Sequence, residues 1–413
     1  MAAKHDQMRN TNTLLVLDHI RVNGDSTRRD IQHATGLSWA AVSNISSELI
    51  ERNVLYELPP QTKFAGRNPG SLDFIPKRNL TIGLELNAEG LAVLLFDLRC
   101  SIVDSLIEPL RSTERDRVIS QMLSAVDRVI KRNSLKCADL LGIGIAMQGS
   151  VDSQGTTSLY NSFFLDWRNV PLKQICEDHF HIPAHVMHDP VCIALSEQWN
   201  RKLGPEDDFA LIRLSYGIGM CYIAHGYPIT GSQGGAGEFG HMVVNPQGPP
   251  CSCGNSGCLE CYSSIRGLAH RILEAHQRGE LSLPANLVHV DDRDVVGMKS
   301  LLAWGAKEAQ TGHPVINRLF CEMGQYLGAG LANIVSLFNP KYLILTGELL
   351  EYTELFWVQA EAKARESAWS FSDYQILFSA GGREGAAKGA ALHYINSAFE
   401  SMTSPLLAQS TPA

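Results

Sequence analysis

Hydrophobic residues near the N-terminus recur every three or four positions, which is the spacing of an amphipathic helix. The first such segment runs from Thr11 to about Asn23, and a second follows Ser26 or Thr27 and ends near Gly36. A third begins at Ser38, whose side chain suits a helix N-cap. Its apolar face consists of Val42, Ile45, Leu49 and Ile50. Two helices joined by a short turn with glycine predict a helix-turn-helix.

Two short apolar segments follow, VLYEL at 54–58 and LDFIP at 72–76, and predict a hairpin wing around PPQTKFAGRNPGS. Short polar side chains on the early turns of the third helix could then reach base edges, while basic residues contact phosphates or a minor groove. The expected base contacts are Ser38, Trp39, Ala40, Ser43 and Asn44, and the expected phosphate or minor-groove contacts are Arg28, Arg29, Lys63 and Arg67. A helical module for protein interaction or dimerisation is the alternative interpretation.

Between residues 80 and 200, apolar runs of strand length alternate with amphipathic segments. The runs LTIGLELN (80–87), LAVLLFDL (91–98) and LLGIGIAM (140–147) flank a helix expected over 115–131. A second cycle begins at FALIRLSYGIGMCYIAHG and continues through helices to the strand YLILTG and a closing helix, GAAKGAALHYI. Such alternation indicates α/β lobes. Two lobes leave a cleft between them, and clefts of this kind collect ligands.

Composition and charge agree with a globular protein of several domains. The chain has 413 residues, more than a single core usually supports, with 45% apolar and 19% charged residues. Its longest apolar runs are far below the ~18 residues needed to cross a bilayer, and no secretory signal is recognisable, which predicts a cytoplasmic protein. Residues 1–78 hold ten basic and eight acidic residues, whereas the whole chain carries −8. A slightly basic N-terminal part is thus joined to an acidic body.

Four of the ten cysteines, Cys251, Cys253, Cys258 and Cys261, lie in or directly after the glycine- and proline-rich segment GEFGHMVVNPQGPPCSCGNSGCLE, residues 237–260. With His241, the first three form H-x9-C-x-C-x4-C, a set of thiolates and imidazole that zinc prefers. An all-cysteine site that includes Cys261 is the alternative. We favour His241, because Cys261 is expected to begin the helix LECYSSIRGLAHRIL and to leave the ion. Four protein ligands leave no position for water, which predicts one structural zinc per chain.

Two glutamates, Glu238 and Glu260, flank these ligands. Carboxylates held rigidly in a cleft are suited to accept hydrogen bonds from sugar hydroxyls, and a zinc-bound histidine can still donate from its other ring nitrogen. Either glutamate alone would more often be a solvated surface charge. Their pairing around the predicted metal loop is what favours a binding role.

From about residue 80 to 395 the chain resembles the ROK family, which comprises bacterial sugar kinases and sugar-responsive repressors with an actin-like (ribonuclease-H-like), two-lobed fold. The segment 237–260 is similar to the family signature. The resemblance implies zinc on the four ligands His241, Cys251, Cys253 and Cys258. It also implies sugar contacts from Asn161, Asp189, Glu238, His241 and Glu260, with Asp189 at the position of the kinases' general base.

Three nucleotide-binding segments of the kinases are altered. Their Asp-x-Gly-Gly-Thr cradle corresponds to Glu85-Leu86-Asn87-Ala88-Glu89, which lacks both glycines that let a backbone approach phosphates. The second phosphate loop is SYGIGM, with Met220 in place of a glycine, and TGELL replaces a glycine-rich adenosine segment. These changes predict sugar binding without phosphoryl transfer, which would leave Asp189 a vestigial base.

The sequence thus predicts a sugar-responsive transcriptional regulator, a repressor of carbohydrate genes. Its expected parts are a winged helix at 1–78, a first ROK lobe at 79–198 completed by a helix at about 385–400, and a second lobe with the zinc loop at 199–384. Expected partners are operator DNA, a monosaccharide or sugar-derivative effector, and further copies in a homodimer or homotetramer, since one winged helix buries little surface. A hexose kinase with a fused DNA-binding part is the alternative, and an activator or a regulator that answers to a protein partner is also open.

Overall fold

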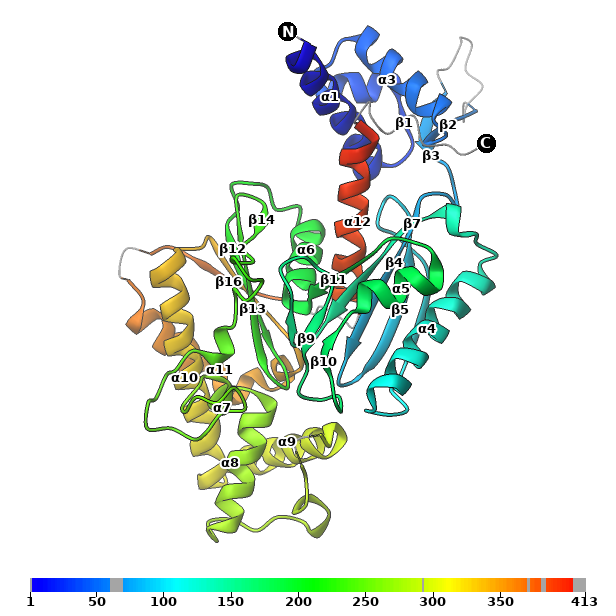
Figure 1. The fold of residues 1–413 in the computed structure, drawn as a ribbon. Coiled ribbons are helices and arrows are strands. Elements are labelled where there is room, and N and C mark those ends of the chain that lie inside the picture. The colour runs from blue at the N-terminus through cyan, green and yellow to red at the C-terminus, as the bar shows by residue number, and fades with distance from the viewer. Residues whose placement is uncertain (1, 60–69, 292, 370–371, 380–383, 404–413) are drawn as a thin grey trace.

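The computed structural model describes residues 2–59, 70–291, 293–369, 372–379 and 384–403. It has three parts, which we call the head (residues 2–74), the first lobe (80–201 with 385–403) and the second lobe (209–378) (Figure 1). The expected Lys63 and Arg67 lie outside the described residues. No helix in the described part of the chain combines the length and apolar character needed to span a bilayer.

The head contains the expected helix-turn-helix. Its helices are α1 (Ala2–Asn23), α2 (Arg28–Thr35) and α3 (Trp39–Glu51), and its antiparallel sheet has the order β1 (Ser26–Thr27), β3 (Ser71–Phe74) and β2 (Leu55–Leu58). Thr27 and Asp30 form a capping box at the start of α2, and the Ser38 hydroxyl accepts a hydrogen bond from the Ala41 amide at the start of α3. These local bonds explain where both helices begin.

Two details of the head differ from the sequence expectation. Helix α1 begins at Ala2 instead of Thr11, and its early part is held by an ion pair between Arg9 and Glu48 of α3. This stretch has no apolar periodicity to reveal it. Strand β1 was not expected, because two residues are too short to form a recognisable pattern.

The first lobe is built on a five-stranded sheet with the order β11-β7-β4-β5-β6. Its strands are β4 (Leu80–Asn87), β5 (Gly90–Phe96), β6 (Ile102–Glu108), β7 (Leu140–Met147) and β11 (Ala184–His188), and its helices are α4 (Arg115–Arg132), α5 (Leu172–Phe180), α6 (Asp189–Arg201) and α12 (Gly385–Thr403). A small sheet of β8 (Ser150–Val151), β9 (Ser158–Tyr160) and β10 (Arg168–Val170) lies after β7. Strand β4 is buried at every position, which explains why most of its residues are apolar, and its polar residues Thr81, Glu85 and Asn87 are buried as well.

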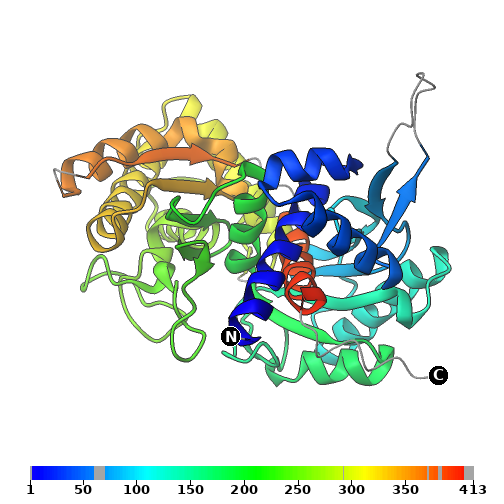
Figure 2. The ribbon, with the colours of Figure 1, turned by 90° about the horizontal axis from the view of Figure 1, so that it is seen from above.

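Helix α12 packs closely on this sheet and on α6. A Cβ atom at Gly83 of β4 would lie 2.0 Å from the Ala387 carbonyl oxygen, and one at Gly389 would lie 1.6 Å from that of Cys192 in α6. Glycine is therefore required at both contacts. In Figure 1, α12 runs from the body up to the head, where it meets α1, and the view from above in Figure 2 shows the two helices next to each other.

The head and the first lobe share one hydrophobic core, because α12 contributes to both. Phe399 of α12 is 2% exposed, and its ring stacks on Phe74 of β3 at 5.9 Å. Arg21 of α1 is buried between Phe399 and Trp199 of α6, with its guanidinium carbon 3.9 Å from the centre of the Trp199 ring. Its Nη1 donates to the Asn396 side chain at 2.9 Å. The head is thus packed onto the body.

The second lobe has a five-stranded sheet with the order β14-β13-β12-β15-β16. Its strands are β12 (Phe209–Leu214), β13 (Ile218–Ala224), β14 (Tyr227–Pro228), β15 (Tyr342–Thr346) and β16 (Gln375–Phe378), and its helices are α7 (Glu260–Ser263), α8 (Ile265–Gln277), α9 (Val295–Gln310), α10 (Pro314–Phe338) and α11 (Thr353–Ser367). Short 3-10 turns lie at Cys137–Asp139 (η1) in the first lobe and at Phe239–His241 (η2), Ala285–Leu287 (η3) and Glu348–Tyr352 (η4) in the second. The two sheets thus form the two α/β lobes that the alternating pattern predicts.

Candidate functional site

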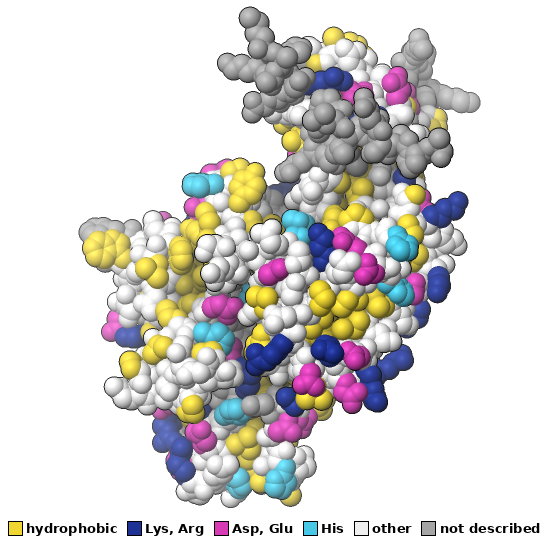
Figure 3. Space-filling view, viewed as in Figure 1, with side chains coloured by type: hydrophobic (Ala, Val, Ile, Leu, Met, Phe, Trp, Pro, Cys, Tyr) yellow, Lys and Arg dark blue, Asp and Glu magenta, His cyan; other side chains and the backbone are white. Residues whose placement is uncertain are grey.

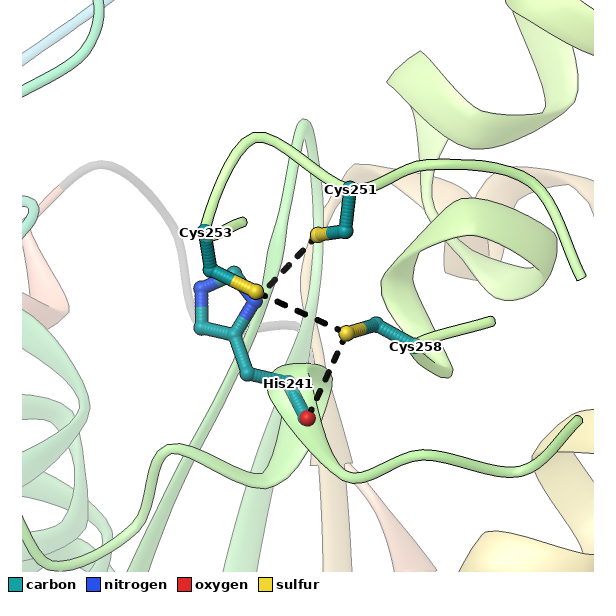
Figure 4. Close-up of side chains that lie close together, drawn as sticks. All are labelled: His241, Cys251, Cys253 and Cys258. Carbon is teal, nitrogen blue, oxygen red and sulfur yellow. Dashed lines mark hydrogen bonds between the residues drawn. The ribbon is translucent and has the colours of Figure 1, made fainter. Parts of the chain in front are cut away.

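Four side chains that could hold a metal ion meet in the loop between β14 and α7 (Figure 4). The ligand atoms of His241, Cys251, Cys253 and Cys258 all lie within 4.8 Å of one another. The Cys253 and Cys258 sulfurs are 3.6 Å apart, and His241 Nδ1 is 3.6 Å from the Cys251 sulfur. Sulfurs bound tetrahedrally to zinc at about 2.3 Å would be separated by about 3.8 Å. The donor set and its spacing therefore suit a tetrahedral zinc ion.

Cys261 lies beside this cluster and donates to the Pro250 carbonyl oxygen at 3.8 Å, but it is not among the four residues whose ligand atoms all lie within 4.8 Å of one another. The expected long helix through LECYSSIRGLAHRIL is in fact two helices, α7 and α8. They are separated at Ser264, which has an extended backbone, and its hydroxyl caps α8 by accepting from the Gly267 amide at 2.9 Å. Serine favours such a cap over a helix interior, which is why the single-helix expectation was wrong.

A cavity of about 400 Å³ lies between the lobes, next to this loop. It is lined by all five residues that the resemblance assigned to sugar contacts: Asn161, Asp189, Glu238, His241 and Glu260. The metal loop also supplies Ser252 and Cys253 to its wall, and aromatic side chains come from Tyr160, Phe163 and Tyr216. Charged side chains of both signs gather in the region between the lobes (Figure 3). The cavity therefore combines apolar walls with a few fixed polar groups.

The two glutamates beside the metal loop are held differently. Glu260 is 7% exposed, accepts a hydrogen bond from the Ile218 amide at 3.0 Å and forms an ion pair with Arg266. Glu238 is more exposed, with its carboxylate 4.0 Å from His241 Nε2. Because Nδ1 of His241 faces the cysteines, its two ring nitrogens point to the metal cluster and to Glu238 respectively.

Asn161 and Asp189 form the opposite wall, and both are buried. The Asn161 side chain donates to the Gln148 carbonyl at 2.9 Å and accepts from the amides of Phe163 and Phe164. One of its N–H groups is left for a ligand in this set of bonds. Asp189 begins α6 and forms an ion pair with Arg213 of β12.

The profile of the ROK family matches residues 81–396, which is well over half of the chain. The chain belongs to the ROK family. Curated relatives include the xylose repressor of Caldicellulosiruptor bescii, 28% identical over 85% of this chain and 86% of that protein. The DNA-binding transcriptional dual regulator NagC of Escherichia coli K12 is also 28% identical, over 84% and 82% of the two chains.

Solved structures agree on the fold. The crystal structure of a ROK family transcriptional regulator, a homologue of the E. coli Mlc protein, superimposes with a TM-score of 0.75 over 96% of this chain and 98% of that one, at 22% identity. A ROK family glucokinase from Streptomyces griseus, in complex with glucose and AMPPNP, covers 76% of this chain and 98% of its own, with a TM-score of 0.61 and 28% identity. The regulator alone of these two also covers the head.

Charged side chains gather in and beside the segments that the resemblance aligns with nucleotide contacts of ROK kinases. Arg213 lies within 4 Å of three carboxylates, those of Asp189, Glu85 and Glu348. Burial raises the pKa of Glu85 to about 7, although Arg213 opposes the shift. Burial would lower the pKa of Arg213, but the three carboxylates outweigh it and raise that pKa. The guanidinium is thus charged at any physiological pH.

Sequence reasoning missed Arg213 and Arg266, which both line the cavity. Arg213 is a lone basic residue inside the apolar run FALIRL, and this was the available signal. Arg266 is the second residue of α8 and reaches Glu260 only because the chain turns at Ser264. Ser264, a residue type that favours helix caps, was the available signal for that turn.

The expected DNA contacts lie on the head as follows. Trp39 is 50% exposed at the start of α3, and the expected Ser38, Ala40 and Asn44 are also exposed, whereas Ser43 is half-buried. Arg29 is exposed on α2, and Arg28 is half-buried and forms an ion pair with Glu57 of β2 at 3.0 Å. The early turns of α3 thus present a free surface.

Proposed function

We propose that this ROK protein is a sugar-responsive, DNA-binding transcriptional regulator, and specifically a repressor of carbohydrate genes. The observation that carries the proposal is the cavity that brings Asn161, Asp189, Glu238, His241 and Glu260 together in a chain that also has a winged-helix head. The curated relatives are repressors named for xylose and N-acetylglucosamine.

A monosaccharide or sugar derivative in the cavity would be held by these polar groups. Carboxylates accept hydrogen bonds from hydroxyls, and the free N–H groups of Asn161 and His241 donate them. The apolar faces of Tyr160 and Phe163 offer surface for the sugar ring. Asp189 holds the ligand here and does not act as a base.

The head would contact operator DNA through α3. In this proposal Ser38, Trp39, Ala40, Ser43 and Asn44 face base edges, while Arg28, Arg29, Lys63 and Arg67 contact the backbone. Two heads in a homodimer or homotetramer would read two half-sites. Binding to chromosomal DNA would place the protein in the cytoplasm.

A structural zinc ion on His241, Cys251, Cys253 and Cys258 is the cofactor we propose. It would stabilise the loop that carries Ser252 and Cys253 into the cavity wall. All four ligands come from the protein, so the ion takes no part in chemistry.

Operator affinity measured with and without sugars tests this function. A fluorescently labelled duplex from the protein's own promoter region is titrated in the presence of D-glucose, D-xylose, N-acetylglucosamine and their 6- or 5-phosphates at fixed salt. We expect at least one of them to weaken binding. The proposal is wrong if the protein does not bind the duplex, or if no sugar in a wider panel changes the affinity of the protein for it.

A ROK sugar kinase with a DNA-binding head is the second candidate, since a ROK glucokinase shares the body fold. A coupled assay for ADP release in the presence of each sugar separates the two functions. Turnover that Asp189→Asn abolishes would establish the kinase.

A further inference from the structure

The three altered nucleotide segments meet in space. Glu85 lies near the end of β4 in the first lobe, Arg213 in β12 just before the SYGIGM loop, and Glu348 follows β15 within TGELL. Glu85 and Glu348 belong to two of these segments, and Arg213 lies two residues before the third; together with Asp189 at the start of α6 they form one charged cluster. Their altered sequences therefore share a structural consequence.

Arg213 joins the two lobes. From the second lobe its guanidinium pairs with Asp189 and lies 3.7 Å from Glu85, both in the first lobe, while Glu348 of the second lobe is 3.8 Å away. The side chains of Arg213, Asp189 and Glu85 are 13%, 5% and 6% exposed, so water screens these charges little. Separating the lobes would break the contacts of Arg213 with Asp189 and Glu85 and leave it only Glu348 among these three carboxylates.

A second ion pair crosses the cleft nearby. Lys299 of α9 pairs with Glu89, which lies in the turn between β4 and β5. Both neighbours of this pair, Ala88 in the turn and Met298 in α9, line the cavity, so the pair lies at its edge. Glu89 stands where the ROK kinases have the threonine of their phosphate cradle, and it is bound here by a lysine from the opposite lobe.

We propose that these residues form a cross-cleft latch that holds the two lobes together in the place where ROK kinases hold nucleotide phosphates. Arg213 and Lys299 are its positioning residues, and Arg213 also fixes Asp189 in the cavity wall. The latch contains two cations and four acidic side chains, Glu85, Glu89, Asp189 and Glu348, so its net charge is negative even when Glu85 is protonated, which repels a nucleotide or a sugar phosphate. The lobes are thus tied together without ATP.

The latch deepens the proposed function and rests on it in one respect, the binding of a sugar at Asp189. A hydroxyl that hydrogen-bonds to Asp189 shares that carboxylate with Arg213, so ligand binding acts directly on the link between the lobes. The ligand this arrangement accepts is an uncharged sugar.

Charge reversal of the peripheral pair tests the latch, because Lys299 is 41% exposed and tolerates substitution without loss of the core. Amide hydrogen exchange of the full-length protein is measured without sugar or DNA for Lys299→Glu, Glu89→Lys and the double variant. We expect exchange in residues 86–91 and 295–299 to accelerate about tenfold in each single variant and to return to the wild-type rate in the double variant. Lys341→Glu is the matched control, since it breaks a lysine–aspartate pair with Asp207 away from the cleft.

The latch is refuted if the single variants exchange like Lys341→Glu, or if the double variant does not recover. Arg213→Lys keeps the charge and should retain protection of the same amides, whereas Arg213→Met should lose it. The sugar titration separates the two proposals. Rescue by the double variant with no effect of any sugar would leave the latch standing and remove the proposed function. A sugar phosphate that acts more strongly than its parent sugar would support the function and refute the latch's ligand preference.

Discussion

Helix α6 connects the cavity with the head, and substitution of Trp199 tests whether it transmits the ligand signal. The helix begins at Asp189 in the cavity wall, and Trp199 lies ten residues, or about 15 Å, further along it. There its ring lies 3.9 Å from the guanidinium carbon of Arg21, a buried residue of α1. Trp199→Ala removes this contact and leaves the cavity intact.

The expected loss follows from the burial of the contact. A desolvated cation–π pair is worth about 2 kcal/mol, and coupling between two sites is typically about 1–3 kcal/mol. Loss of about 2 kcal/mol corresponds to roughly a thirtyfold change in an equilibrium constant. The sugar changes operator affinity by some factor in the wild type. We therefore expect this factor to be up to about thirtyfold smaller in Trp199→Ala.

The assay is fluorescence anisotropy of a promoter duplex at fixed salt, with and without a saturating sugar, for both proteins. Trp369→Ala is the control, because Trp369 is 64% exposed in the second lobe. Thermal denaturation verifies that each variant is folded at the assay temperature. An unchanged sugar effect in folded Trp199→Ala would refute transmission through this contact, as would an equal loss in Trp369→Ala.

Three further predictions concern the metal loop, the packing of α12 and the buried carboxylate. Cys253→Ser should lose about one zinc per chain by elemental analysis and weaken the sugar response, whereas Cys321→Ser, outside the cluster, should keep both. Gly83→Ala should lower the free energy of unfolding by about 1–3 kcal/mol or more, because its Cβ would lie 2.0 Å from the Ala387 carbonyl oxygen. Thermal or urea denaturation measures this, and Gly235→Ala, where the added Cβ meets open space, should be neutral. The pKa of Glu85 is raised from an ordinary 4.5 to about 7, so between these pH values the folded state binds a proton that the unfolded state has released. The contribution of Glu85 to the free energy of unfolding therefore falls as the pH rises from about 4.5 through 7. Relative to Glu85→Gln, the wild type should lose up to about 3 kcal/mol between pH 4.5 and 8, and parallel pH profiles of the two proteins would contradict this.

Much of the fold could be predicted from patterns that extend over single elements. The runs at 80–87 and 140–147 coincide with β4 and β7, because strands buried on both faces read as continuous apolar segments. The helix expected at 115–131 matches α4 to within one residue, since its apolar face alternates with charges. Thr27 and Ser38 predicted the starts of α2 and α3, because N-capping is a local interaction that residue type reveals.

The features that escaped prediction depend on partners far away in the sequence. Arg213 is 24 residues from Asp189 in the chain, and the same guanidinium also reaches Glu85 and Glu348. A sequence shows that Glu89 is out of place in a phosphate cradle, but it does not show that Lys299 faces it. The Cys/His cluster was easier to recognise, because its four residues lie within one loop and their spacing alone indicates a possible donor set.

The closeness of α12 to Gly83 and Gly389 has a consequence for how the protein would search for its operator. A DNA-binding domain on a flexible linker can reorient independently of the rest of the protein. This head packs tightly on the first lobe through α12, so its orientation follows that of the body. In a complex of two copies, the distance between the two recognition helices would then depend on the relative orientation of the two bodies. A small rotation there would put one helix out of phase with the turn of the double helix.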